Sequence, residues 1–276
     1  MRSFISSPSN ELIKKILVLQ SKSRVRKKEG IFVVEGAREI SLALEAGIAF
    51  REILVCEEIA REKDLLMLQE LFESKSAHGT ETPEQVGISR KVYERVAHRK
   101  TTEGIIGMAV APKKTLGDLQ LGDNPLLLVA EASEKPGNIG ALLRTADAAN
   151  LDGVIIANPL TDLYNPNIIR SSMGCVFTQQ VVGASSPEVL AFLKEHNIKV
   201  LSAALVESSK PYYEVDCTGP TAIVVGTEAT GLSAEWLDGS DETVIIPMEG
   251  TIDSLNVSVS AAILIFEAKR QRAALI

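Results

Sequence analysis

The chain has 276 residues, 45% of them hydrophobic and 24% charged, so it can bury a core and is not an intrinsically disordered chain. Aromatic residues make up only 4%, which argues against a stacking platform for single-stranded nucleic acid. The net charge of −7 disfavours nucleic-acid binding by the whole surface, although residues 1–110 hold 18 Lys and Arg against 16 Asp and Glu and are slightly basic.

The first elements in chain order predict a small α/β domain. Apolar residues at helical spacing run over 10–21, with Asn10 as the expected cap. Strands and helices then alternate along the chain. The expected strands lie at 31–36, 51–56 and 103–110, and the expected helices at 37–47 and 65–74.

A basic run, "KSRVRKKEG" at 22–30, separates the first helix from the first of these strands. It places five Lys or Arg side chains in seven positions. Such a run is either a solvated basic loop or a contact for a polyanion. The side chains concerned are Lys22, Arg24, Arg26, Lys27 and Lys28.

The second half of the chain alternates more clearly. Residues 111–124 have few large apolar groups and predict a linker, so we expect domains at 1–110 and 125–276. The later strands are expected at 126–130, 153–157, 176–182, 198–203, 221–226 and 243–246, and the helices at 138–150, 186–196, 233–238 and 254–272. Apolar strands between helices predict a parallel sheet covered on both faces, whose ligands bind beyond the carboxyl ends of its strands.

Two of those strand ends carry glycine-rich turns. After 126–130, Asn138 lies between glycines at the start of a helix, where backbone amides can face a polar ligand. Arg144 follows in that helix, either as a surface residue or as a functional one. After 221–226 comes "GTEATGLS", in which Gly226 and Gly231 enclose Glu228. That pattern is either a tight connection or a carboxylate held at the ligand-binding edge.

The third strand end leads into "IPMEGTIDSLNVSVSAAILIFE". Ser254, Asn256, Ser258 and Ser260 alternate along it, at the mouth of the last helix. Helix capping needs only one such residue, so capping alone does not explain four.

Together, "NIGALLRTADA", "VVGTEATGLS" and the stretch beginning "IPMEGTIDSLN" resemble the three signature motifs of the SpoU/TrmH family of RNA ribose 2′-O-methyltransferases, part of the SPOUT superfamily. They occur in family order within about residues 131–272. The run "FVVEGAREISLALEAG" is similar to the substrate-binding domain often joined to this family, which resembles ribosomal proteins.

The resemblance implies a C-terminal parallel-sheet SPOUT domain with a deep trefoil knot, a smaller N-terminal α/β RNA-binding domain, S-adenosylmethionine as the methyl donor, and a homodimer. It implies no metal. The expected donor-binding residues are Gly226, Ile246, Leu255, Gly231 and Met248. The expected catalytic residues are Arg144, Asn138, Glu228, Ser254 and Asn256.

The resemblance favours ribosomal RNA over transfer RNA as the substrate. Arg144 would either take the proton of the 2′-hydroxyl or stay charged and stabilise the developing alkoxide. Two alternatives are a non-enzymatic RNA-binding protein and a nucleotide-dependent oxidoreductase, whose glycine fingerprint this sequence lacks. Three dispersed cysteines, no signal peptide and no apolar run of membrane length predict a soluble cytoplasmic protein with no membrane partner.

Overall fold

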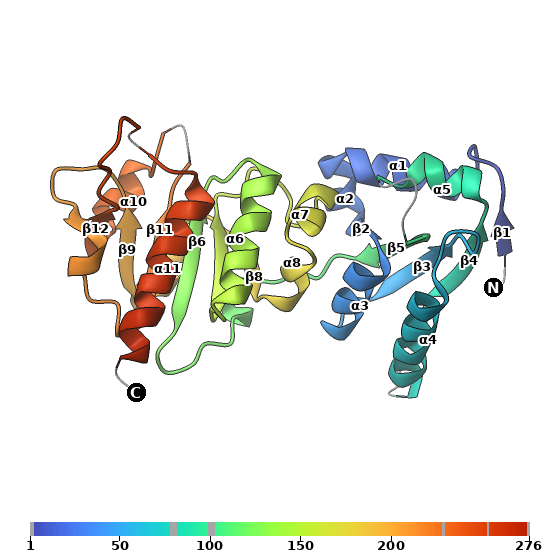
Figure 1. Ribbon diagram of the computed structural model, residues 1–276, viewed down its shortest axis with the longest axis horizontal. Coiled ribbons are helices and arrows are strands. Elements are labelled where there is room, and N and C mark those ends of the chain that lie inside the picture. The colour runs from blue at the N-terminus through green and yellow to red at the C-terminus, as the bar shows by residue number, and fades with distance from the viewer. Residues whose placement is uncertain (1–2, 78–81, 99–102, 228–229, 253, 275–276) are drawn as a thin grey trace. The chain divides into compact units, whose positions relative to one another are not determined.

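The computed structural model describes residues 3–77, 82–98, 103–227, 230–252 and 254–274 (Figure 1). The chain divides into two compact units. Unit 1 comprises Met1–Lys113 and Tyr164–Thr178, and unit 2 comprises Lys114–Leu163 and Gln179–Ile276.

Unit 1 is built on a mixed five-stranded sheet with the order β1-β4-β3-β5-β2. Its strands are β1 (Ser3–Ile5), β2 (Ile31–Glu35), β3 (Phe50–Val55), β4 (Glu84–Ile88) and β5 (Ile105–Val110). Its helices are α1 (Glu11–Ser21), α2 (Ser23–Glu29), α3 (Ala37–Glu45), α4 (Glu62–Ala77), α5 (Arg90–Val96), α7 (Pro166–Ser171) and α8 (Cys175–Thr178). Strands β2 and β3 both pair antiparallel with β5, which places the two strands on either side of it.

Local sequence explains the first helices of unit 1. Asn10 caps α1 by accepting a hydrogen bond from the Leu12 amide at 2.8 Å, and one apolar face of α1 is fully buried in the core of the unit. Helix α2 ends at Gly30, which has the left-handed backbone (φ 64°) that glycine adopts most easily.

Unit 2 contains a seven-stranded sheet in which every recorded pairing is parallel, with the order β10-β12-β9-β11-β6-β7-β8. Its strands are β6 (Leu126–Glu131), β7 (Gly153–Ala157), β8 (Val181–Ala184), β9 (Lys199–Ala203), β10 (Lys210–Pro211), β11 (Thr221–Val225) and β12 (Glu242–Ile245). Its helices are α6 (Pro136–Ala148), α9 (Ser186–Glu195), α10 (Ala234–Asp238) and α11 (Val257–Ala273), with short 3₁₀ turns at Leu116–Asp118 and Tyr212–Glu214.

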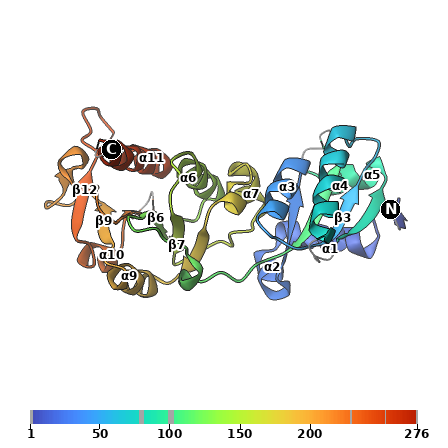
Figure 2. The ribbon, with the colours of Figure 1, turned by 90° about the horizontal axis from the view of Figure 1, so that it is seen from below.

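The central strands β6 and β11 are buried along their whole length, which the apolar residues that make up most of each strand predict. Figure 2 shows α6 and α11 on one face of the sheet and α9 and α10 on the other. The α/β class and the parallel sheet predicted from the sequence are therefore confirmed.

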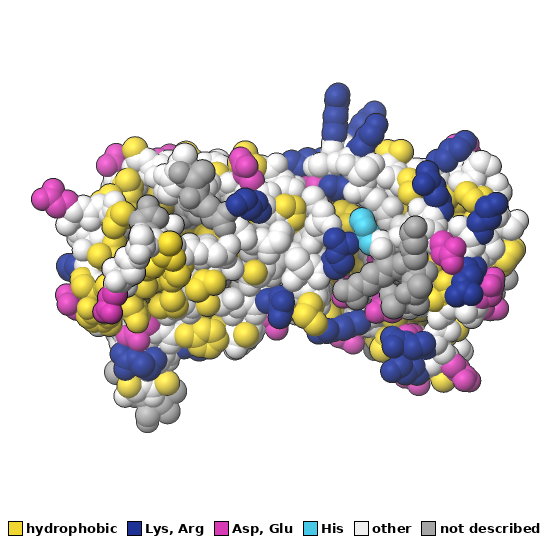
Figure 3. Space-filling view, turned by 45° about the horizontal axis from the view of Figure 1, so that its top comes forward, with side chains coloured by type: hydrophobic (Ala, Val, Ile, Leu, Met, Phe, Trp, Pro, Cys, Tyr) yellow, Lys and Arg dark blue, Asp and Glu magenta, His cyan; other side chains and the backbone are white. Residues whose placement is uncertain are grey.

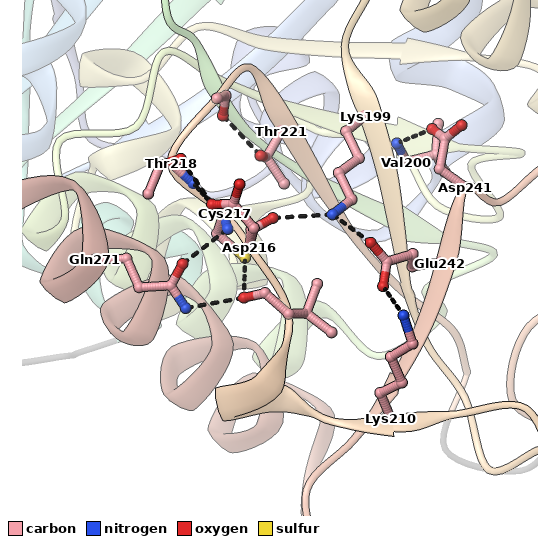
Figure 4. A network of polar contacts seen from close by, with 12 residues as sticks. Lys199, Val200, Lys210, Asp216, Cys217, Thr218, Thr221, Asp241, Glu242 and Gln271 are labelled. Carbon is pink, nitrogen blue, oxygen red and sulfur yellow. Dashed lines mark hydrogen bonds and ion pairs between the residues drawn. The ribbon is translucent and has the colours of Figure 1, made fainter.

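The last helix, α11, is fastened to the sheet at its C-terminal end. The guanidinium of Arg272 donates to the carbonyl oxygens of Cys217 (3.0 Å), Asn124 (2.8 Å) and Pro125 (3.1 Å). The Gln271 side chain accepts from the Cys217 amide and donates to the Val215 carbonyl, as Figure 4 shows. These bonds satisfy carbonyl groups that precede β6 and β11, so α11 and the two central strands are held in one arrangement.

Three sequence expectations need correction. The run 176–182 was expected to be one strand, but it contains the end of α8, and β8 begins only at Val181. The basic run at 22–30 was considered as a loop, but most of it forms α2. Leu119 lies in the expected linker 111–124, yet it is 8% exposed and packs in the core of unit 2.

Candidate active site

The candidate residues of unit 2 follow the carboxyl ends of β6, β11 and β12. Strands β6 and β11 are neighbours in the sheet, and β12 is separated from β11 only by β9. Because all these strands are parallel, their carboxyl ends lie at the same edge of the sheet, which is where parallel α/β sheets bind ligands.

Asn138 and Asn256 are 118 positions apart in the chain and meet at this edge. The Asn256 side-chain amide donates to the Asn138 Oδ1 at 3.2 Å. Asn256 also caps α11, because its Oδ1 accepts from the Ser258 amide at 3.0 Å and from the Ser258 hydroxyl at 2.6 Å. One side chain therefore fixes the start of α11 and joins it to the start of α6. Ser254, two residues earlier, is exposed.

Gly226 and Gly231 close the loop after β11. The Thr227 amide donates to the Gly231 carbonyl at 3.1 Å, and the Gly231 amide donates to the Thr227 carbonyl at 3.0 Å. A Cβ on Gly226 would overlap the Gly231 carbonyl group and lie 2.5 Å from the Leu232 nitrogen, so only glycine permits this approach. Glu228 lies in this loop and outside the described residues.

Glu131 supports the same loop and was missed in the sequence. It is 5% exposed at the end of β6, and its carboxylate accepts from the Ser233 amide at 2.8 Å. Ser233 is the residue before α10. A buried carboxylate is costly unless it is bonded, so this contact fixes the far end of the loop that begins at Gly226. The available signal was a glutamate that ends an otherwise apolar strand.

A cavity of about 500 Å³ lies beside the loop that joins β12 to α11. Its walls come from the ends of β9 and β12, from that loop and from one side of α11. Three of the expected donor-binding residues, Ile246, Met248 and Leu255, line it together with Ser254. Gly226 and Gly231 are not among its lining residues and instead pack against each other.

The volume lies in the usual range of cofactor sites. None of the described residues that line the cavity carries a charged side chain, so recognition there must rely on backbone groups, hydroxyls and apolar contact. The lining contains no Lys or Arg that would repel a cationic sulfonium, and its apolar residues can contact an adenine ring. The residues present therefore fit S-adenosylmethionine.

Arg144 lies on α6, six residues after Asn138, and is exposed. The buried side chains of α6 point the other way, into the core; they include Ile139, Leu142 and Leu143. The structure thus brings Asn138 and Asn256 into contact and leaves the guanidinium of Arg144 at the surface of the same helix.

The five basic residues proposed for RNA contact divide into two groups. Lys22, Arg24, Lys27 and Lys28 are exposed. Figure 3 shows Lys and Arg side chains standing out from the part of unit 1 that carries α1 and α2. Arg26 differs from the expectation, because it is 4% exposed and its guanidinium donates to the carbonyls of Leu19 and Gln20 at the end of α1. Its place in the proposed RNA-contact set is therefore withdrawn.

No cluster of three or more His, Cys, Asp or Glu in the described ranges could hold a metal ion. None of the helices found there is long and apolar enough to cross a membrane.

Two family models match the chain. The SpoU rRNA methylase family matches residues 125–266, and the MRM3-like substrate-binding domain matches residues 10–107. The chain is 30% identical to the 23S rRNA (guanosine(2553)-2′-O)-methyltransferase RlmP of Bacillus subtilis over 266 residues. This alignment covers 96% of this chain and 98% of that protein.

Solved structures agree with these matches. A crystal structure of an RNA 2′-O ribose methyltransferase is 38% identical with a TM-score of 0.80, covering 98% of this chain and 99% of that one. The SpoU methyltransferase AviRb from Streptomyces viridochromogenes, in complex with AdoMet, is 28% identical with a TM-score of 0.83, covering 96% of this chain and 99% of that one.

Proposed function

We propose a reaction and a substrate for this protein from one premise, that the chain belongs to the SpoU rRNA methylase family. It is an S-adenosylmethionine-dependent enzyme that methylates a ribose 2′-hydroxyl in RNA. We assign ribosomal RNA rather than transfer RNA as its substrate. The support is that a relative similar over almost its whole length is named as a 23S rRNA enzyme.

One observation carries the assignment of the site. The cavity beside the β12–α11 loop includes Ser254 in its lining, and two residues later Asn256 bonds to Asn138. A donor held in the cavity by Ile246, Met248 and Leu255 would therefore lie next to a group of polar side chains. Bound there, S-adenosylmethionine supplies an electrophilic methyl group. The separation of an apolar cavity from a polar rim suits transfer of that group to a hydroxyl.

The residues of the chain would act mainly by positioning. Asn138 and Asn256 fix each other through their 3.2 Å hydrogen bond, which holds both side chains in place beside the proposed ribose site. Orientation of two reactants contributes up to roughly 7–11 kcal/mol to a barrier of this kind. Ser254, Asn256 and Arg144 are all exposed, so the hydroxyl proton can pass to water. Glu228 keeps its proposed place in the site on the sequence motif alone.

We assign Arg144 an electrostatic role. Arg144 is exposed on α6, and its planar guanidinium suits contact with a phosphate or an alkoxide. It would bind the phosphate beside the target ribose and stabilise the alkoxide as it forms.

Arg144→Ala tests the assignment. We expect kcat for methyl transfer to fall by about 100-fold or more, because a charge aimed at the developing alkoxide is lost. The Kd of S-adenosylmethionine, measured by titration calorimetry, should stay within about twofold, since Arg144 does not line the cavity. Lys194→Ala is the matched control, as it removes one exposed positive charge from α9 on the opposite face of the sheet. Near-normal kcat in Arg144→Ala would overturn the role.

The wider organisation is also proposed. Residues 1–110 bind RNA, 111–124 connect the two domains, and 125–276 perform catalysis, although 164–178 pack with unit 1 and Leu119 packs in the core of unit 2. The exposed Lys22, Arg24, Lys27 and Lys28, on and before α2, supply phosphate contacts. We infer that unit 2 contains a deep trefoil knot, supported by the return of α11 to pack on α6 and β11.

The three free cysteines support a reducing, cytoplasmic location.

A homodimer is proposed from the outer face of α11. Val259 and Phe266 are 46% and 50% exposed, and they lie seven positions apart, which places them on one side of the helix. Figure 3 shows hydrophobic side chains gathered on unit 2 in this region. A second copy would cover this stripe and bring its own α6, with Arg144, close to the same interface.

A further inference from the structure

Glu131 occupies a position in β6 at which packing favours an apolar side chain. Side chains two positions apart along a strand lie on the same face of the sheet, so Glu131 shares its face with Leu127 and Val129. Both of these are fully buried in the core cluster that also contains Leu232 and Trp236. Glu131 itself is only 5% exposed. Burial of a carboxylate here costs free energy that a leucine would not, so the contact that Glu131 makes needs a reason.

The contact of Glu131 is with the far end of the loop after β11. The register of β6 against β11 ends with the pair Ala130 and Val225, so Glu131 and Gly226 follow this pair on neighbouring strands. The Glu131 carboxylate accepts from the Ser233 amide at 2.8 Å. The loop therefore leaves the sheet beside the backbone of Glu131 and is bonded to the side chain of the same residue where it ends.

Helix α10, which follows the loop, is fixed by other contacts. Trp236 is fully buried, and its indole N–H donates to the Ser186 hydroxyl at 2.8 Å. Just beyond the helix, the Ser240 hydroxyl donates to the Ser202 hydroxyl on β9 at 2.6 Å. These contacts hold α10 against the sheet without Glu131. The bond from Glu131 to Ser233 therefore acts chiefly on the loop that precedes the helix.

The loop keeps its shape through contacts among its own residues. Thr227 and Gly231 exchange two backbone bonds, and the Thr230 amide donates to the Thr227 hydroxyl at 3.1 Å. A turn closed in this way takes its orientation from its two ends. One end is β11, and the other is Ser233, which Glu131 holds. Glu228, which the sequence motif assigns to the reaction, belongs to this loop.

We propose that Glu131 is a positioning residue for methyl transfer, which holds the loop after β11 in the orientation that the reaction needs. The inference rests on the proposed function, because that function assigns the loop to the site. Glu131 has a rigid base, since the Ala132 amide donates to the Ala157 carbonyl at 2.8 Å and continues the pairing of β6 with β7. Support from a strand of the sheet positions a site more precisely than support from a loop.

Two substitutions of Glu131 test the role. Glu131→Leu removes the acceptor and continues the apolar face of β6, whereas Glu131→Gln keeps an oxygen that can accept from the Ser233 amide. The assay is transfer from labelled S-adenosylmethionine to unmodified ribosomal RNA by the full-length protein. We expect kcat of Glu131→Leu to fall about tenfold or more, the scale of one lost hydrogen bond to a carboxylate. Glu131→Gln should stay within about threefold of the unaltered protein, because the bond is kept.

The Kd of S-adenosylmethionine separates positioning from loss of the donor site. It should change by less than about twofold in both variants, because Glu131 is not among the residues that line the cavity. Titration calorimetry measures this Kd and also counts the donor-binding sites. Expressing kcat per donor-binding site removes the contribution of unfolded protein from the comparison.

Asp152→Leu is the matched control for a purely structural effect. The Asp152 carboxylate accepts from the Leu126 amide at 2.8 Å, so it also holds a backbone amide, but at the amino end of β6. That end lies at the edge of the sheet opposite the proposed site. Both leucine variants lose one such bond and should unfold at lower urea concentrations. Only Glu131→Leu should lower kcat per donor-binding site.

Hydrogen exchange tests the position of the loop without methyl transfer. The amides of Thr230, Gly231 and Ser233, followed by mass spectrometry of peptic fragments, should exchange about tenfold faster in Glu131→Leu. In Glu131→Gln they should exchange as in the unaltered protein.

Three results would overturn the proposal: unchanged exchange in Glu131→Leu, a normal kcat in a variant whose loop exchanges faster, or a Glu131→Gln variant as impaired as Glu131→Leu. Absence of methyl transfer by the unaltered protein would instead contradict the proposed function. Exchange alone would then decide whether Glu131 holds the loop.

Discussion

At the scale of single residues, close backbone approach decides the shape of the loop after β11. Gly226 lies directly against Gly231, and the two-way bond between Thr227 and Gly231 closes the turn. The sequence motif indicated that these glycines matter, but it assigned them to donor contact. The structure shows a nearer physical reason, which is that no other residue fits at Gly226. The contact between Asn138 and Asn256 could not be predicted from sequence spacing alone, because the two residues are 118 positions apart and lie on different elements.

Gly226→Ala should lower the free energy of unfolding by about 1–3 kcal/mol, since an added methyl group forces the backbone of 231–232 to move. Urea denaturation would measure the change. Gly219→Ala is the control because its Cβ would meet nothing within 4 Å. Equal stability of the two variants would show that the close approach is not required.

At the scale of elements, ion pairs join the three strands β10, β12 and β9 at one edge of the parallel sheet. Glu242 on β12 forms ion pairs with Lys199 on β9 at 2.6 Å and with Lys210 on β10 at 2.8 Å (Figure 4). The hydrogen bonds from Lys199 and then Lys210 lower the pKa of Glu242 below its ordinary value of 4.5. The side chain is 27% exposed, so the energy involved is modest.

A lowered pKa in the folded state means that the stabilisation is present above pH 4.5 and is lost as the pH falls through the lower folded value. Glu242→Gln should therefore cost a few tenths to about 1 kcal/mol at pH 7. This deficit should shrink toward zero under more acidic conditions. Urea denaturation across pH would measure it, with the exposed loop variant Glu207→Gln as control. A deficit that stays constant down to strongly acidic pH would contradict the ion-pair explanation.

The sequence predicted elements well where apolar periodicity was long and poorly where it was short. The alternation of buried strands and helices in unit 2 could be predicted, because β6 and β11 each contain four consecutive apolar residues or more. The run 176–182 was not, since a short apolar run fits a helix as well as a strand. Helix α2 was obscured by its charges, and the burial of Arg26 depends on carbonyls of the preceding helix that no composition reveals.

At the scale of the whole molecule, the exposed stripe on α11 bears on assembly. Phe266→Glu places a charge in the proposed interface, so the species measured by light scattering should shift from dimer to monomer. Phe4→Glu is the matched control, as Phe4 is 69% exposed on β1 of unit 1. A monomeric unaltered protein, or a dimer that tolerates Phe266→Glu, would remove α11 from the interface.

The central claim is methylation of a ribose in ribosomal RNA, and methyl transfer itself tests it most directly. Labelled S-adenosylmethionine would be incubated with the protein and unmodified 23S rRNA or transfer RNA, and the RNA digested to nucleosides. We predict a labelled 2′-O-methylnucleoside from the ribosomal RNA and much less label in the transfer RNA. Label on a base, or the same nucleoside only from transfer RNA, would contradict the claim.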